Sequence, residues 1–369
     1  MGLLAWVGIV AGAAIALFVI QVIHLSAVLA WENERTNGLA YYGRSPAERE
    51  RYKRTLARHA RLLSPVLWLM GRGSKFTFER ASFRYQGVAG PKGTCSEASF
   101  AAAAAYEARA EDVFVVTQMK CGTTWMQHVV YEVLHRGNGD LVDSGATLYG
   151  VCPWLEGLKS VPVDQAPLLG AERASRVIKT HMPVSLCPWS AEARYIYVAR
   201  HPVSCFASCV DFIATNAGRM APEVAAVEAW FTSAEAMFWT PWPDHVTGWW
   251  ERSRKESNVL FVYFEDMKRD LPATVRQVAA FLGVAPLTPA ELARVVEKCG
   301  FAYMQRHQDS FEMNPPHLLQ TDAELFVRGS ADRHKDVPAE TRRRISAWAA
   351  ERMAGGTFPL SEKYPDVGA

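Results

Sequence analysis

The first pattern in the chain is an apolar run close to the N-terminus. Residues 3–23 are apolar apart from Gln21, and the apolar character continues, less regularly, to Trp31. About 20 apolar residues are enough to cross a bilayer as a helix. A secretory signal peptide would have a basic start and a shorter apolar core. We therefore predict a transmembrane anchor over residues 1–31, and a buried core helix is the alternative.

Beyond residue 83 the pattern alternates between short β-branched apolar runs and helical periodicities. Such alternation is typical of a mainly parallel sheet flanked by helices. We therefore expect a single α/β domain over residues 83–369. Strands are expected at 113–117, 176–180, 194–199 and 259–264, and helices at 101–110, 124–136, 203–215, 223–238, 245–255, 273–282, 289–298 and 338–353.

Residues 32–82 connect these two regions and form a basic juxtamembrane linker. The segment SPAE at 45–48 is a capping box with proline at the first helical position. The helix that it begins has apolar residues such as Tyr52 and Leu56 on one side and arginines elsewhere. A second apolar run, 62–70, is too short to span a bilayer. A basic amphipathic helix on an anionic leaflet and a helix packed on its own domain are equally good interpretations.

Charge and cysteine content predict the side of the membrane on which the domain lies. The net charge of +2 means that any anion site must be local, and it does not favour nucleic acid as a partner. Arginines and lysines follow the apolar run and none precedes it, so the domain is expected in the cytoplasm as part of a single-pass membrane protein. Seven cysteines without framework spacing fit a reducing compartment. A lumenal, Golgi-type anchored enzyme is the competing arrangement.

The segment KCGTT (120–124) predicts a phosphate site, because it forms a turn of small residues between an expected strand and the N-terminus of an expected helix. The first backbone N–H groups of a helix lack partners, and the helix dipole favours an anion there. Thr123 and Thr124 add hydroxyl donors, and Lys120 adds a mobile positive charge. The turn is not a Walker loop, because Lys120 precedes Gly122 and no Gly-Lys-Ser/Thr occurs in the chain. An ordinary turn with an incidental lysine is the alternative.

Further polar residues follow the other expected strands, where open α/β sheets bind their ligands. A lone histidine is more often structural than catalytic, and Arg200 could instead pair with Asp211 or Glu265. The residues are Lys179 and His181 at the end of one strand, Arg200 and then Ser208 after another, Asp266 after the fourth, and Arg328 in a basic C-terminal loop.

Together these segments resemble the PAPS-dependent sulfotransferases, particularly the cytosolic type (PAPS is 3′-phosphoadenylyl sulfate). VFVVTQMKCGTTW is similar to the 5′-phosphosulfate loop of that family, and YIYVARHPVSCFAS to its 3′-phosphate segment. IKTHMP is similar to the catalytic-histidine segment, and FVRGSADRHK to the C-terminal Arg-Lys-Gly loop. The resemblance covers roughly residues 83–353 and implies the P-loop-like sulfotransferase fold.

The resemblance also implies a role for each matching residue. It implies PAPS as co-substrate, PAP as product and no metal. His181 would be the catalytic base, assisted by Lys120 and Lys179. The cofactor-binding set would be Lys120, Gly122, Thr123 and Thr124 at the 5′-phosphosulfate, Arg200, Ser208, Arg328 and Gly329 at the 3′-phosphate, and Trp125 and Phe301 on the adenine, with Phe264 nearby.

The chemistry of sulfuryl transfer agrees with these roles. The leaving phosphate gathers negative charge, so a lysine and a helix N-terminus can bind the transition state better than the ground state. An imidazole with a pKa near ~6.5 can accept the proton of an attacking hydroxyl.

Some positions depart from the family pattern. Cysteine beside an anion-binding turn can have a lowered pKa, although a tolerated small residue is the favoured interpretation of Cys121. Because the lysine, histidine, arginine and serine positions are all present, we predict an active enzyme. The departures are Cys121 for serine, Met119 for proline, Phe264 for tyrosine, Cys299 for threonine, and Gly329 for lysine in a loop one residue shorter.

The resulting prediction is a membrane-anchored sulfotransferase that acts on a hydroxyl of a small, apolar acceptor. Loops at 149–158 and 309–319 are rich in aromatic and apolar residues and are the candidate acceptor pocket. A P-loop kinase or NTPase is the alternative enzyme. A catalytically silent membrane scaffold is the third interpretation of the sequence. A homodimer is compatible with the sequence.

Overall fold

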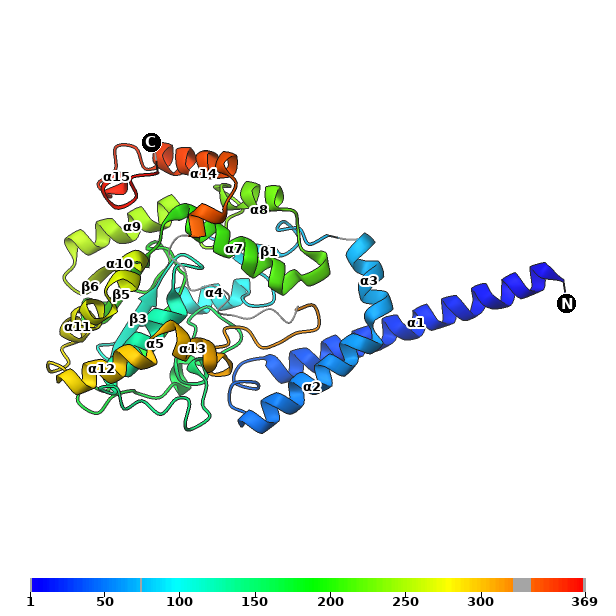
Figure 1. Cartoon of the computed structure of the whole chain (residues 1–369), viewed down its shortest axis with the longest axis horizontal. Coiled ribbons are helices and arrows are strands. Elements are labelled where there is room, and N and C mark those ends of the chain that lie inside the picture. The colour runs from blue at the N-terminus through cyan, green and yellow to red at the C-terminus, as the bar shows by residue number, and fades with distance from the viewer. Residues whose placement is uncertain (1, 74, 321–332, 368–369) are drawn as a thin grey trace.

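The computed structural model describes residues 2–73, 75–320 and 333–367. A four-stranded parallel sheet lies at the centre of the domain (Figure 1). Its order is β4 (Arg176–Thr180), β3 (Asp112–Val116), β5 (Arg194–Ala199) and β6 (Val259–Tyr263). The predicted parallel α/β sheet is confirmed, and each strand lies within one residue of its expected place.

Alternate residues of each strand face two separate hydrophobic cores. Phe114 and Val116 of β3 face a core shared with α7 (Pro202–Ala217), whereas Val113 and Val115 face a core shared with α5 (Thr123–Leu134). Because helices cover both faces, the strands are almost entirely buried.

The remaining helices of the domain surround this sheet. The α-helices are α4 (Glu97–Ala104), α6 (Leu148–Val151), α8 (Val224–Phe231), α9 (Trp242–Lys255), α10 (Phe264–Arg269), α11 (Leu271–Leu282), α12 (Pro289–Lys298), α13 (Phe301–Arg306), α14 (Ala339–Arg352) and α15 (Leu360–Lys363). The 3-10 helices are η1 (Val163–Gln165), η2 (Gly218–Met220), η3 (Gln308–Ser310) and η4 (Arg333–Asp336).

Local interactions that the apolar pattern does not reveal move several boundaries. The alanine-rich helix begins at Glu97, earlier than predicted, because Ser96 and Ser99 form a reciprocal cap. The helix expected over 223–238 ends at Phe231. Helix α10 and the antiparallel pair β1 (Ser82–Tyr85) and β2 (Val88–Pro91) were not predicted.

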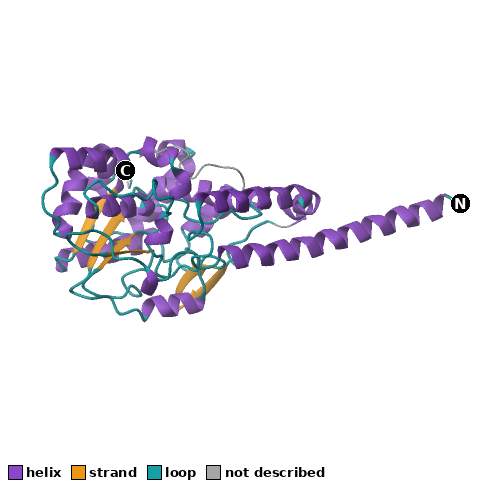
Figure 2. Cartoon of the chain, turned by 90° about the horizontal axis from the view of Figure 1, so that it is seen from below, coloured by secondary structure: helices purple, strands orange, loops and turns teal. Residues whose placement is uncertain are grey.

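Three helices precede the domain: α1 (Leu3–Thr36), α2 (Pro46–Leu62) and α3 (Ser64–Gly73). The first part of α1 projects away from the domain (Figure 2), and every residue from 6 to 20 is exposed. By length and composition, α1 could cross a membrane.

Helix α2 has the predicted capping box at Ser45 and Glu48. It packs on its own domain, since the Tyr52 hydroxyl donates to the Pro316 carbonyl at 2.9 Å and Arg49 donates to the Gly145 carbonyl at 3.1 Å. The structure therefore supports the second of the two interpretations of this helix.

Candidate active site

The KCGTT turn joins β3 to the N-terminus of α5. Gly122 is the N-cap residue of α5, with φ of +99°. A Cβ atom at this position would lie 2.7 Å from Cδ2 of Phe264, so both the backbone conformation and the space require glycine. Lys120 also has a positive φ, of +64°. The turn thus brings its backbone close to Phe264 and presents the first N–H groups of α5 as a site for an anion.

His181 is buried just after the end of β4, and its ring is fixed by the end of β3. Its Nδ1 lies 2.8 Å from the Thr117 carbonyl oxygen, which can only accept. Nδ1 therefore carries the proton and Nε2 has the lone pair. The Thr117 hydroxyl, 3.3 Å from Nδ1, also contacts the Thr123 hydroxyl at 2.7 Å. This hydroxyl thus links the histidine to the phosphate turn.

The backbone of His181 is held from two sides. Its N–H donates to Glu156 Oε1 at 2.8 Å, and its carbonyl accepts from His245 Nε2 at 2.9 Å. Glu156 is fully buried and also accepts from the Thr180 hydroxyl at 2.8 Å. Burial, together with the nearby Lys179, lowers the pKa of His181 well below its usual range. A neutral imidazole is therefore the resting form at neutral pH.

Lys179 is fully buried in β4, two residues before His181. Its Nζ lies 3.6 Å from the centre of the Trp154 ring and donates to the Tyr149 hydroxyl at 3.3 Å. Burial lowers the pKa of Lys179 to about 7, although Glu156 opposes that shift. Tyr149 also contacts the Thr124 hydroxyl at 3.2 Å. The loop at 149–158 therefore supplies two aromatic side chains to this cluster.

Lys120 and Arg200 meet on the other side of the turn. Arg200 donates to the Lys120 carbonyl at 2.9 Å and lies over the Phe264 ring at 4.4 Å. The Lys120 ammonium lies 4.4 Å from the ring centre of Phe212 on α7. Burial lowers the pKa of Lys120, and Arg200 adds to the decrease. Two cations thus converge beside the N-terminus of α5.

The two acids considered as partners of Arg200 also bind other groups. Asp211 forms an ion pair with Arg333, and Glu265 accepts the backbone N–H of His201 at 3.0 Å. Asp266 pairs with Arg269 at 2.6 Å.

Trp125 and Phe301 both lie near one lysine. The Lys268 ammonium is 5.7 Å from each ring centre. The Trp125 indole N–H donates to the Cys299 carbonyl at 2.8 Å, which fixes the ring. Ser208 is half-buried on α7. Arg328 and Gly329 lie outside the described residues, so their predicted positions are not compared.

Cys121 is fully buried, with its Sγ 3.7 Å from Sγ of Cys205 on α7. Burial raises the pKa of the Cys121 thiol well above its usual range, and Cys205 adds to the increase. The structure therefore contradicts the lowered pKa considered for Cys121 and supports a small packed residue.

Sequence reasoning missed several residues of this cluster. None of them was assigned to the catalytic cluster from the sequence, although Thr117 lies in the same motif as the phosphate turn and the isolated acid in the apolar run PWLEG was a signal that could have been used. They are Thr117, Tyr149, Trp154, Glu156, Phe212 and His245.

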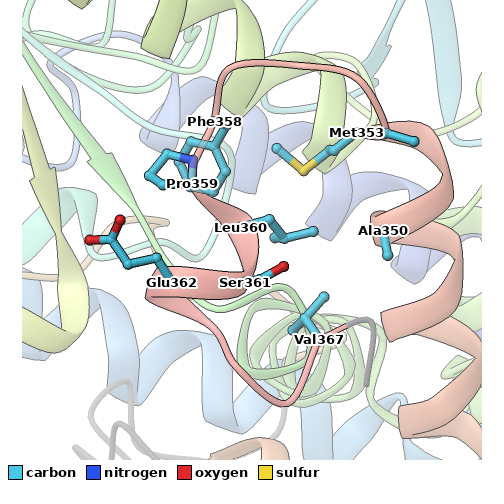
Figure 3. Close-up of a pocket in the computed structure, with 9 residues that line it drawn as sticks. Ala350, Met353, Phe358, Pro359, Leu360, Ser361, Glu362 and Val367 are labelled. Atoms are coloured by element: carbon cyan, nitrogen blue, oxygen red, sulfur yellow. The ribbon is translucent and has the colours of Figure 1, made fainter.

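A pocket of about 420 Å³ lies in a different part of the domain, and Figure 3 shows the side chains that line it. Its walls come from the end of α14 and the segment that follows, including Met353, Phe358 and Val367. Among the predicted site residues that the structure describes, none lines it. Within the described part of the chain, no cluster of histidine, cysteine, aspartate or glutamate could hold a metal ion.

Comparison with known families identifies the domain. The sulfotransferase domain model matches residues 110–357, which is more than half of the chain. The chain belongs to the sulfotransferase family. The family predicted from the motifs, and with it a sulfotransferase enzyme, is confirmed.

Individual relatives agree with this assignment. Rat sulfotransferase 1 family member D1 is 32% identical over 48% of this chain and 60% of its own length. Human sulfotransferase 2B1 is 28% identical over 78% of this chain and 79% of its own length.

Two solved structures share the fold. Mouse sulfotransferase SULT7A1, complexed with PAP, superposes with a TM-score of 0.56 at 22% identity over 74% of this chain and 95% of its own. A retinol dehydratase complexed with androsterone and PAP gives 0.59 at 20% identity over 77% of this chain and 96% of its own. The predicted sulfotransferase-type fold is confirmed.

Proposed function

We propose that this protein transfers the sulfuryl group of PAPS to a hydroxyl of a small, apolar acceptor. The observation that carries the proposal is the tautomer of His181: its Nδ1–H is held by the Thr117 carbonyl, so Nε2 has a lone pair to accept a proton. The same Thr117 contacts Thr123 at the helix N-terminus, so base and anion site are adjacent.

The proposed roles follow from charge and position. Nε2 of His181 takes the proton as the acceptor oxygen attacks sulfur and the bond from sulfur to the leaving phosphate oxygen breaks. Lys120, Lys179 and the N–H groups of α5 stabilise the charge that develops on that oxygen. The other proposed contacts are Gly122, Thr123 and Thr124 at the 5′ side, Arg200 and Ser208 with Arg328 and Gly329 at the 3′-phosphate, and Trp125, Phe264 and Phe301 around the adenine.

An apolar acceptor is supported by the surroundings of the base. Trp154 and Trp239 have ring centres 5.7 and 4.7 Å from that of His181. The retinol dehydratase with this fold is solved with androsterone and, separately, with retinol. The other candidate loop, 309–319, reaches α7 through His317, whose ring lies 3.3 Å from the Asn216 amide oxygen, one turn beyond Phe212.

We infer that the chain is divided into an anchor (1–31), a basic connecting region (32–82) and the sulfotransferase domain (83–369). Exposure of α1 from 6 to 20 supports the anchor, and the arginines that follow it support a cytoplasmic domain. Protease added outside sealed cytoplasmic-side-out vesicles should digest the domain. Protection in intact vesicles and digestion after permeabilisation would indicate the Golgi-lumenal arrangement instead.

The activity is tested by transfer of labelled sulfate from PAPS to a panel of sterols, phenols, alcohols, amines and glycans. Labelled product on an apolar hydroxyl compound is the expected result. ATP hydrolysis without PAP binding would support the kinase or NTPase alternative. PAP binding without transfer to any acceptor would support the silent scaffold.

A further inference from the structure

Helix α3 has one face on the protein and one apolar face exposed. Its inner face packs on η2, where a Cβ at Gly71 would lie 2.9 Å from Arg219 Cβ. On the outer side of α3, Trp68 is 46% exposed and Leu69 49%, and Leu62, the last residue of α2, is 61% exposed. These three residues are called the α3 face below. Large apolar side chains grouped in this way indicate a surface that meets another apolar phase.

The α3 face begins at the level where α1 first touches the protein. The Gln21 side-chain amide donates to the Leu62 carbonyl at 2.9 Å, which places the corner between α2 and α3 beside Gln21. Residues 3–20 of α1 precede this point, and at 1.5 Å per residue they extend about 27 Å, close to the thickness of a bilayer hydrocarbon core. If α1 spans a membrane, this corner lies at its surface.

The direction of α3 fits that surface. In Figure 1, α3 runs across the direction of α1 and α2, which lie side by side through contacts such as that between His24 and His59. A helix that crosses a membrane-spanning helix in this way lies along the membrane plane. Trp68 sits under the guanidinium of Arg72, 4.6 Å from its ring centre. Tryptophan and arginine side chains are typical of the headgroup level.

The chain segment that carries the α3 face has charges of one sign. Between Glu50 and Glu79 the chain contains seven arginines and lysines and no acidic residue. Arg58 and Arg61 are exposed before the α3 face, and Arg72 and Lys75 are exposed at its far end. Basic residues near an anionic leaflet are attracted to its surface. This charge complements anionic lipid rather than a neutral protein surface.

We propose that the α3 face is an interfacial contact that inserts into the anionic leaflet through which α1 passes. This inference rests on the membrane anchor proposed above. The α3 face adds a second membrane contact beside α1. Two contacts together fix the orientation of the domain on the membrane. The loop at 309–319 is tied to the same assembly, since Glu32 of α1 accepts the Leu318 N–H at 3.0 Å. The candidate acceptor loop would then keep a fixed position relative to α1.

The test places one fluorescent label on the full-length chain in lipid nanodiscs. All seven native cysteines are buried, so an added exposed thiol can be labelled selectively. Leu69→Cys and Leu62→Cys report on the α3 face, Ile15→Cys reports on the span, and Glu251→Cys on α9 is the aqueous control. The discs contain phosphatidylcholine alone or with phosphatidylserine. The readouts are the emission shift and quenching by lipids with a spin label near the headgroup.

The emission of labels at 62 and 69 should shift to the blue. Lipids with a spin label near the headgroup should quench these labels, more strongly when phosphatidylserine is present. Replacing Arg61 and Arg72 together by glutamate should reduce that quenching several-fold and leave the label at 15 unchanged. A label at 69 that stays in water while the label at 15 is quenched would overturn the α3 contact and keep the anchor. Labels at both positions in water would overturn the anchor, and the α3 contact with it.

Discussion

The Nδ1 atom of His181 donates a hydrogen bond to the carbonyl oxygen of Thr117, at 2.8 Å. Since the acceptor is a backbone atom at the end of β3, the orientation of the imidazole is set by the sheet itself. The same strand end leads into the phosphate turn. The spacing between base and anion site is therefore a property of two adjacent parallel strands, β3 and β4.

His181→Ala is expected to lower kcat by about 10²- to 10⁴-fold, because the attacking hydroxyl loses its proton acceptor. The dissociation constant for PAP should remain close to that of the wild type. Single-turnover transfer and calorimetric PAP binding measure the two effects. His135→Ala, at a half-buried histidine outside the site, is the control. Full turnover in the His181 variant would exclude this residue as the base.

Lys179 should take up a proton when PAP binds. Its pKa is lowered to about 7 by burial, so at about pH 8 it is mostly neutral in the unliganded protein. A bound phosphate favours the ammonium form and raises that pKa, so binding is accompanied by proton uptake. Calorimetry in buffers of different ionisation enthalpy measures the uptake.

Lys179→Met should reduce this uptake, whereas Lys255→Met, at an exposed lysine on α9, should not. Lys120 also has a lowered pKa and accounts for uptake that persists in the Lys179 variant. Equal uptake in the wild type and in Lys179→Met would show that Lys179 does not respond to the ligand.

The sequence predicted the sheet well because each strand carries its own signal. A run such as 113–117 is apolar at every position, as required when helices cover both faces. The predicted helix boundaries were wrong where side chains cap the backbone. Ser96 and Ser99 set the start of α4, and hydrophobic periodicity does not reveal such caps.

The motifs of the candidate site were predicted one by one from the sequence. The contacts between these motifs could not be predicted. Lys179 and His181 could be named from one segment, but the pKa of Lys179 depends on its burial against Trp154, which lies in a distant loop. Glu156 holds the backbone of His181 from the same loop. Such tertiary neighbours have no fixed spacing in the chain, so no local pattern can identify them.

Gly122→Ala should lower the free energy of unfolding by about 1–3 kcal/mol and abolish tight PAP binding. An alanine there has an unfavourable positive φ, and its Cβ meets Phe264 at 2.7 Å. Gly93→Ala is a matched control, since Gly93 has φ of +88° but no atom within 4 Å of the added Cβ. Chemical denaturation and PAP binding compare the two variants. Equal losses in both would show that the contact with Phe264 is unimportant.

Asp366, near the C-terminus, should support PAP binding through His201. Nδ1 of His201 accepts the N–H groups of Val203 and Ser204 and so caps α7. Nε2 must then carry the proton, and it donates to Asp366 at 3.1 Å. Burial lowers the pKa of His201 to about 4, so the ring remains neutral and keeps this cap. The C-terminal segment thereby fixes the residue next to Arg200.

Asp366→Ala should loosen that cap at a cost of about 1 kcal/mol, which weakens PAP binding roughly fivefold. The KM for PAPS should rise with little change in kcat, because His201 positions the helix and does not touch the reacting atoms. Asp366→Asn keeps an acceptor oxygen and should restore most of the affinity. Glu362→Ala, at an exposed position of the same segment, is the control. If Asp366→Ala lowers thermal stability but binds PAP as tightly as the wild type, the contact only stabilises the fold.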